Sequence, residues 1–423
     1  MRVHPPYLIA IATLVLATAV AAQQAGVFVE SRDHGAIQYT SGPEDNRITR
    51  LNQRLADGSL TLRFEEGTGY LKSLLEALQV PIESQMLVFS KTSLQSSLIN
   101  MHNPRAVYFA DSVAVGFVRG GELLEVSVHD PRQGAVFYAL PQQPAERPQL
   151  ERGNTCLACH LSWETLGVPG LIAMSTYPLK DDKLDYANGL PNDHRSPFPE
   201  RWGGWYVTGD AGGARHMGNV GVMVADRART KLTNPLAVRP SLEGLFDLKG
   251  YLTPYSDVAA LMVLSHQVRA TNLITRAGWE ARVAAAAGPE AMSRVRDAAS
   301  ELADYLLFVD EVPLARPMQS TSGFPETFAA AGPVDSKGRS LRQMDLTRRM
   351  MRFPVSYMIY SEAFDALPAP ARDVVYQRLW DVLSGSSRDR RFSRLTLADR
   401  QAAVDILRET KNDLPAYFEP VTR

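Results

Sequence analysis

The sequence predicts an α+β protein, and three observations along the chain lead to this class. Short apolar runs separated by Gly and Pro turns, typical of strands, fill most of the first third. A central stretch rich in Gly, Pro and Trp has little regular pattern, and apolar residues recur with a helical period after it. We therefore divide the chain into an N-terminal leader (1–22), a strand-rich α+β region (23–150), a loop-rich central segment (151–240) and a helical region (241–423).

The first residues have the pattern of a secretory signal peptide. Met1-Arg2 supplies a positive charge, an apolar run extends from Tyr7 to Val20, and small residues follow up to Ala22. The run is short for a membrane anchor, so we expect cleavage near Ala22 and a periplasmic or secreted bacterial protein. No later stretch is apolar and long enough to cross a bilayer, so no transmembrane span is expected after cleavage.

The strand-rich region predicts an antiparallel sheet with one or two helices. A short helix at 68–78 is stopped by Pro81, and Gly120-Gly121 predicts a hairpin turn between two strands. The expected strands are Met86–Phe89, Ala106–Phe109, Val113–Val118, Leu123–Val128 and Ala135–Leu140.

The helical region begins at Thr253-Pro254, where Thr is suited to cap a helix and Pro to its first turn. We expect this helix to continue to Ala287, where Gly288-Pro289 ends it. Further helices are predicted at 289–309, 341–352, 371–383 and 397–411, the last with a capping box made by Thr396 and Asp399.

One motif in the central segment carries chemistry, Cys156-Leu157-Ala158-Cys159-His160, which contains the only two cysteines of the chain. At this spacing two thiols can join the two vinyl groups of one haem, and the histidine that follows can bind the iron. A zinc site would need more Cys or His ligands than the motif offers. A disulfide or a redox-active dithiol remains open, although the proline-rich residues 141–148 before the motif do not read as the central strand that a thioredoxin-like site requires.

These five residues resemble the haem-attachment motif of c-type cytochromes, and the resemblance covers little else of the chain. It implies one covalent haem c on Cys156 and Cys159, with His160 as an axial ligand. In such proteins the haem is attached outside the cytoplasmic membrane, which agrees with export. Bacterial cytochrome c peroxidases and haem rubber oxygenases carry two such motifs, and this chain has one.

The resemblance leaves the second axial position of the iron to be assigned. Met217 lies about as far beyond the motif as the axial Met does in small c-type cytochromes, although the usual flanking proline is missing. The alternatives are His216 and His266. His266 shares an apolar helical face with Met262, so it is a candidate distal ligand or a catalytic acid–base group.

Haem propionates need cationic or hydrogen-bonding partners when they are partly buried. Arg201 and Arg215 are candidates, as are Arg152 and Arg195, because all lie near the motif in sequence. Trp205 is expected to stack on the porphyrin or to line its pocket.

The predicted function is that of an exported monohaem redox protein, with electron transfer favoured. One alternative is a haem-dependent oxidoreductase, similar to a peroxidase or an oxygenase, with an open or His-ligated distal site. A haem-based sensor or binding protein is the other. The expected partner is a redox protein or a small-molecule substrate. Nucleic acid is not expected, since the formal net charge is only −1 over 423 residues.

Overall fold

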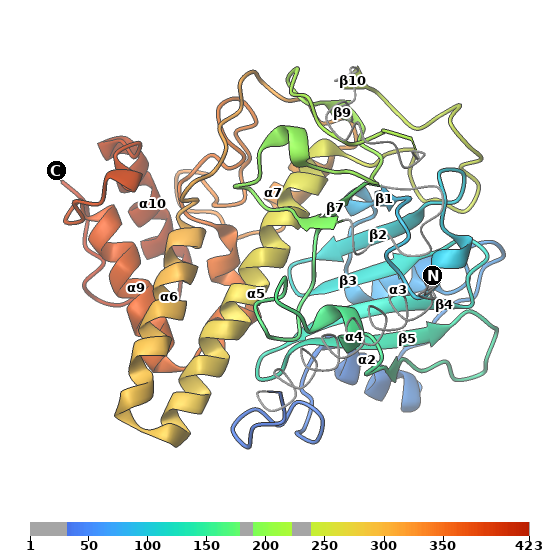
Figure 1. Cartoon of the computed structure of the whole chain (residues 1–423), viewed down its shortest axis with the longest axis horizontal. Coiled ribbons are helices and arrows are strands. Elements are labelled where there is room, and N and C mark those ends of the chain that lie inside the picture. The colour runs from blue at the N-terminus through green and yellow to red at the C-terminus, as the bar shows by residue number, and fades with distance from the viewer. Residues whose placement is uncertain (1–31, 178–188, 222–237, 423) are drawn as a thin grey trace, which may run out of the picture.

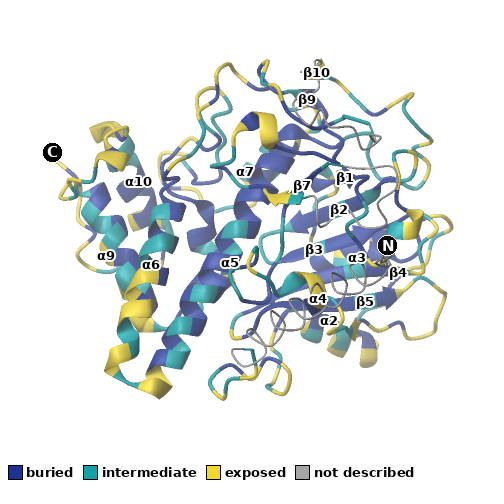
Figure 2. Ribbon diagram, in the orientation of Figure 1, coloured by how far each residue is buried: buried dark blue, intermediate teal, exposed yellow. Residues whose placement is uncertain are grey.

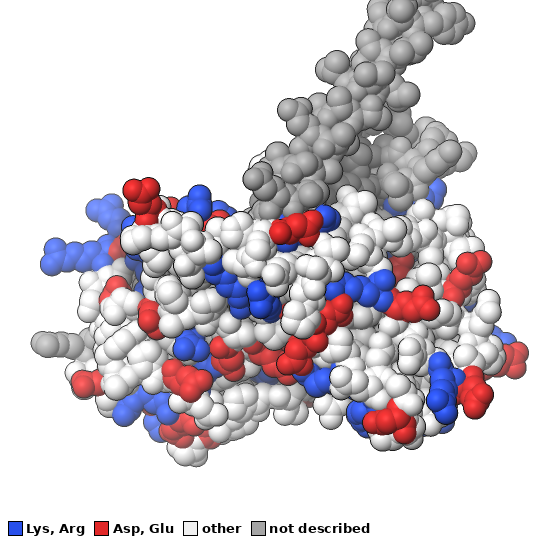
Figure 3. All heavy atoms as spheres, turned by 90° about the horizontal axis from the view of Figure 1, so that it is seen from below, with Lys and Arg blue, Asp and Glu red and all other residues white. Residues whose placement is uncertain are grey.

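The computed structural model describes residues 32–177, 189–221 and 238–422, and it has the predicted α+β class. A strand-rich N-terminal part and a C-terminal set of helices lie side by side (Figure 1). The proposed leader lies outside the described residues. Within the three described ranges, no helix combines the length and the apolar composition that crossing a bilayer requires. Basic and acidic side chains are interspersed on the face seen in Figure 3.

Six antiparallel strands form the main sheet, and they are ordered as they follow in the sequence. The five predicted strands are confirmed to within about two residues at each end, and Gly120, at φ +77°, forms the expected turn between two of them. The strands are β1 (Met86–Val88), β2 (Arg105–Ala110), β3 (Val113–Phe117), β4 (Leu123–Asp130), β5 (Gly134–Pro141) and β6 (Glu151–Arg152).

The two faces of this sheet have different coverings. Alternate residues such as Tyr108, Val115 and Val126 are buried in one hydrophobic core together with the helices α2 (Arg47–Ala56) and α3 (Leu71–Leu78), behind the sheet in Figure 1. The prediction included α3 but not α2, which Asn46 caps at its start. The opposite face carries Val107, Glu125 and other residues that stay partly exposed.

Helix α5 (Val258–Ala287) lies between the sheet and the C-terminal helices and is buried along most of its length, as its dark colour in Figure 2 shows. The predicted start of this helix at Thr253 was wrong. The helix begins after Asp257, its N-cap residue, whose carboxylate accepts the N–H of Ala259 at 2.8 Å. The carbonyl groups of Thr253 and Tyr255 are instead bound by a side chain of the sheet region, so this stretch is held in an extended loop.

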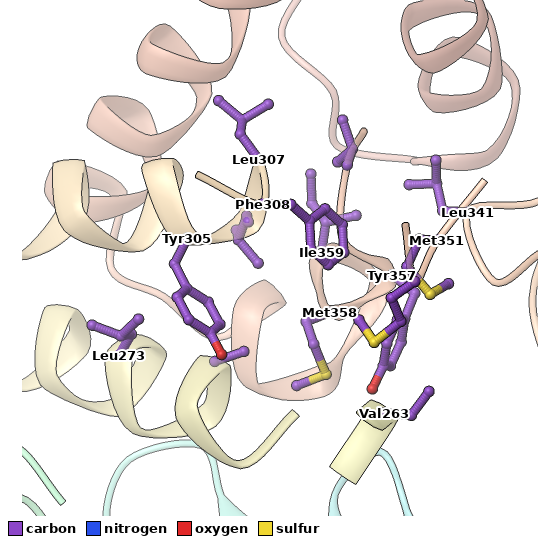
Figure 4. Close-up of a cluster of buried hydrophobic side chains, with 14 of the residues drawn as sticks. Val263, Leu273, Tyr305, Leu307, Phe308, Leu341, Met351, Tyr357, Met358 and Ile359 are labelled. Carbon is purple, nitrogen blue, oxygen red and sulfur yellow. The ribbon is translucent and has the colours of Figure 1, made fainter. Parts of the chain in front are cut away.

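The remaining helices are α6 (Met292–Leu306), α7 (Phe324–Ala330), α8 (Glu362–Asp365), α9 (Ala369–Leu383) and α10 (Leu397–Thr410). Of these, α6, α7, α8 and α9 contact α5, and α10 packs on α9. Three of them match the predictions, and the capping box of Thr396 and Asp399 is confirmed. Figure 4 shows Tyr305, Phe308, Tyr357 and Met358 in the core that these elements share.

The helix predicted at 341–352 was wrong. These residues form a looped hairpin in which Met344 pairs with Met351 through an isolated bridge. Leu346 adopts φ +53°, which turns the chain, and both Leu341 and Met350 are buried. Their burial from the two limbs of the hairpin outweighs the local helical pattern.

The amide of Gln85 joins the sheet region to the start of α5. Its oxygen accepts hydrogen bonds from the Tyr108 hydroxyl at 2.6 Å and from the Leu252 N–H at 3.0 Å. Its nitrogen donates to the carbonyls of Thr253 at 2.7 Å and Tyr255 at 2.9 Å. Gln85 is fully buried. If its amide were removed, water could not reach the groups that it binds to take over these hydrogen bonds.

We therefore expect the substitution Gln85→Met to lower the free energy of unfolding by about 3 kcal/mol, because it leaves several buried donors and acceptors without partners. Urea unfolding measures the change. Gln53→Met is the matched control, since Gln53 is exposed on α2. Equal stabilities of the two variants would contradict the role given to Gln85.

Candidate haem-attachment site

The motif forms the single turn α4 (Leu157–His160), in front of the sheet in Figure 1. Cys156 precedes the turn, and its carbonyl accepts the N–H groups of Cys159 at 3.2 Å and His160 at 3.0 Å. Residues three and four positions apart lie on the same side of a helical turn. The two cysteines and the histidine therefore share one side of α4.

Both cysteines are present as thiols, with Cys156 partly buried and Cys159 exposed. Burial raises the pKa of each thiol, and the Glu125 carboxylate raises the pKa of Cys156 further. Dithiol exchange proceeds through a thiolate, which a lowered pKa favours. The environment of this pair therefore does not favour a thioredoxin-like reaction.

The imidazole of His160 is held in one orientation by the loop that follows. Its Nδ1 lies 2.9 Å from the carbonyl oxygen of Gly170, and the Gly170 N–H donates to the His160 carbonyl at 2.9 Å. A carbonyl can only accept, so Nδ1 carries the proton and Nε2 presents its lone pair. In the described part of the chain no hydrogen bond to Nε2 is found. Metal-binding histidines are oriented in this way by a bond from their other nitrogen.

Asn272 of α5 anchors the same loop. Its side-chain oxygen accepts the Leu171 N–H at 3.1 Å, and its nitrogen donates to the Leu171 carbonyl at 2.8 Å. A Cβ on Gly170 would lie 2.3 Å from the Asn272 oxygen, so only glycine allows this approach. The position of His160 is thus fixed to α5 through two neighbouring residues of the loop.

The partly exposed sheet face beside the motif holds a polar cluster. Arg105 of β2 forms a 3.0 Å ion pair with Glu125 of β4, which also accepts a hydrogen bond from the Ser93 hydroxyl at 2.6 Å. Gly116 of β3 lies between the two strands and leaves room for the pair. The ring of Phe137, on β5, lies 4.7 Å from that of His160. The Nε of Arg105 is buried and has no partner among the described residues.

The structure places Trp205 elsewhere. Trp205 forms a bridge with Val88 on the outer side of β1, and its indole donates to the carbonyl of Met174 at 2.7 Å in the short strand β7 (Met174–Thr176). At about 4.8 Å for each strand, five strand spacings put its backbone about 24 Å along the sheet from the strand of Phe137.

His216 and Met217 lie near Trp205. The Sδ of Met217 is buried and lies 3.9 Å from the Ser175 hydroxyl. The ring of His216 contacts Trp202 edge-on at 5.1 Å, and its Nδ1 accepts the N–H of Gly218 at 3.0 Å. Within the described residues, no hydrogen bond or ring contact connects either side chain to His160.

The four arginines predicted near the propionates are also dispersed. Arg201 is buried and donates to the carbonyls of His194 at 2.9 Å and Ser196 at 2.8 Å; burial lowers its pKa to about 10. Arg215 is exposed. Two form ion pairs, Arg152 with Glu44 and Arg195 with Asp193.

Both ring nitrogens of His266 form hydrogen bonds inside the helical core. Its Nδ1 lies 2.8 Å from Nδ1 of His194 and its Nε2 lies 2.7 Å from the Ser356 hydroxyl. His194 Nε2 faces the Val309 carbonyl at 3.4 Å and must donate to it. His266 therefore donates from Nδ1 and accepts from Ser356, and both imidazoles are neutral.

Comparison of the chain with protein-family models, with curated proteins and with solved structures finds no match. The residues of the site are therefore the basis for a proposed function.

The buried histidines predict a loss of stability in mild acid. Burial lowers the pKa of His194 to about 3 and those of His129 and His216 to about 4. Below about pH 6.5 the unfolded chain binds protons that the folded chain does not, so the free energy of unfolding falls by up to about 1.4 kcal/mol per histidine for each pH unit. Urea unfolding at about pH 7 and pH 5 measures this. His194→Asn should give a shallower pH dependence, and an unchanged dependence would contradict the assignment.

Proposed function

We propose that this chain is an exported, monohaem, c-type cytochrome-like redox protein that transfers electrons. Cys156 and Cys159 would hold one haem c, and His160 would bind the iron. The observation that carries the proposal is the state of His160, with its proton on Nδ1, its Nε2 available, and the two thiols on the same side of the turn. The periplasmic location rests on the sequence of the leader.

The residues around α4 fit such a group. Each thiol would add across one vinyl group, forming a carbon–sulfur bond while its hydrogen goes to the other vinyl carbon, so no oxidant is needed. The haem supplies a one-electron couple when bound. Arg105 offers a buried Nε donor that lacks a partner, which suits a propionate. Small residues, Gly116 and Ala139, leave the neighbouring sheet face shallow.

The exposure of the motif favours electron transfer. Cys159 is exposed, and Trp163, three residues after the motif, is 59% exposed. Electron exchange weakens steeply with distance, so a group attached at this surface is reached directly by a partner protein. An exposed aromatic side chain beside the attachment point suits a protein contact.

Covalent attachment is tested by expressing the chain in cells that mature c-type cytochromes. We expect the purified protein to have the mass of the processed polypeptide plus one haem, and the double variant Cys156→Ser, Cys159→Ser to lack it. His160→Ala should keep the haem mass but lose the low-spin absorption spectrum, whereas His102→Ala, an exposed control, should keep both. An unmodified wild-type polypeptide would refute the proposal.

The polar cluster on the sheet predicts the sign of changes in reduction potential. Removing the negative charge with Glu125→Gln should raise the potential, because the reduced state carries one more electron; Arg105→Gln should lower it. We expect shifts on the order of tens of millivolts, measured by spectroelectrochemical titration. Glu76→Gln, on the opposite side of the sheet, is the control. Shifts of the opposite sign, or none, would place the haem away from this cluster.

A further inference from the structure

A second candidate site is formed by two adjoining hollows at α2, α3, α7 and the β2–β3 turn. The first, the α7 cavity, has a volume of about 720 Å³ and lies between α3, the β2–β3 turn, α5 and α7. The second, the α2 groove, has a volume of about 640 Å³ and lies between α2 and α3. Arg47, Glu76 and Gln79 line both, so the two hollows adjoin. Each volume is in the range of small-molecule sites.

The α7 cavity is apolar at its inner end. The rings of Phe109, Phe324 and Phe328 follow one another along the wall, at 5.8 Å and 5.5 Å between centroids. The guanidinium of Arg342 is nearly buried there and is paired with Asp111, while its Nε has no hydrogen-bond partner among the described residues. An apolar chain fits against the three phenyl rings.

The α2 groove has the opposite character. Arg47, Arg50 and Arg54 lie at positions i, i+3 and i+7 of α2 and so line one helical face, and Arg63 lies across the groove. Arg50 pairs with Asp45 at 2.7 Å, and Arg63 with Glu76 at 2.5 Å. Arg47 and Arg54 have no ion-pair partner among the described residues. Like charges on one helical face repel, and an anion bound between them relieves this repulsion.

We propose that these two hollows together bind a single-chain amphiphile with an anionic head. The alkyl chain lies in the α7 cavity and the head lies on the α2 groove, beside Arg47 at the junction of the two. The orientation follows from the rings and the charges: the three phenyl rings lie at the inner end, where Arg342 is ion-paired with Asp111, whereas the outer end has an excess of guanidinium groups. This site shares no lining residue with the haem-attachment motif or with the Arg105–Glu125 cluster.

The test is calorimetric titration of the purified holoprotein with dodecanoate below its micellar concentration. We expect one site per chain, with dodecanol binding at least about tenfold more weakly and dodecyltrimethylammonium more weakly still. Arg47→Glu should weaken dodecanoate binding by about tenfold or more, whereas Arg408→Glu, an exposed control on α10, should not. Equal affinity for all three probes, or equal effects of the two substitutions, would overturn the proposal.

The apolar part of the site is tested separately. Thr327 of α7 lines the cavity and Ala330 of the same helix does not. Thr327→Trp should fill the cavity and weaken dodecanoate and dodecanol alike, while Ala330→Trp should leave both unchanged. Dodecanoate binding that survives Thr327→Trp would place the chain elsewhere. If Thr327→Trp does not fold, the comparison of the Arg47 and Arg408 variants alone tests whether the amphiphile binds at this site.

Discussion

The constraint on which this structure depends is the burial of α5 between two different partners. One side packs on the sheet and the other on α6 and the helices after it, so the helix has almost no face left for water. Small residues such as Ala260, Ala270 and Ala277 are fully buried along it and allow close approach from both sides. Because α5 is rigid and central, a residue that is hydrogen-bonded to it is held in a fixed position.

Asn272 transmits that constraint to the candidate haem site. Its amide holds Leu171, the neighbouring Gly170 holds the imidazole of His160, and each bond is between a donor and an acceptor with one possible direction. A site that must present one nitrogen in one orientation is thus built on a helix rather than on a free loop. The same helix carries His266, whose nitrogens are both used inside the core.

The hydrogen bonds of the histidines distinguish those with a structural role from the one with a candidate functional role. His129 is buried and its imidazole is hydrogen-bonded to the Thr275 hydroxyl at 3.2 Å, while His194 and His266 are hydrogen-bonded to one another. Each of these pairs joins distant parts of the chain. His160 instead uses one ring nitrogen in a hydrogen bond to the loop that follows it. The other nitrogen is available beside two thiols and the charged cluster on the sheet. The proposed amphiphile site uses none of these groups and lies at α2, α3, α7 and the β2–β3 turn.

The sequence alone determined the features that depend on neighbouring residues. Strand alternation, the turn at Gly120, the capping box of Thr396 and the spacing of Cys156, Cys159 and His160 are all set within a few positions. Tertiary structure decided what depends on distant contacts. The loop at 341–352 and the start of α5 follow from burial and from bonds such as that of Gln85 to Tyr255, 170 positions away. The same holds for the separation of Trp205 and Met217 from His160, since closeness in sequence does not fix the strand on which a side chain lies.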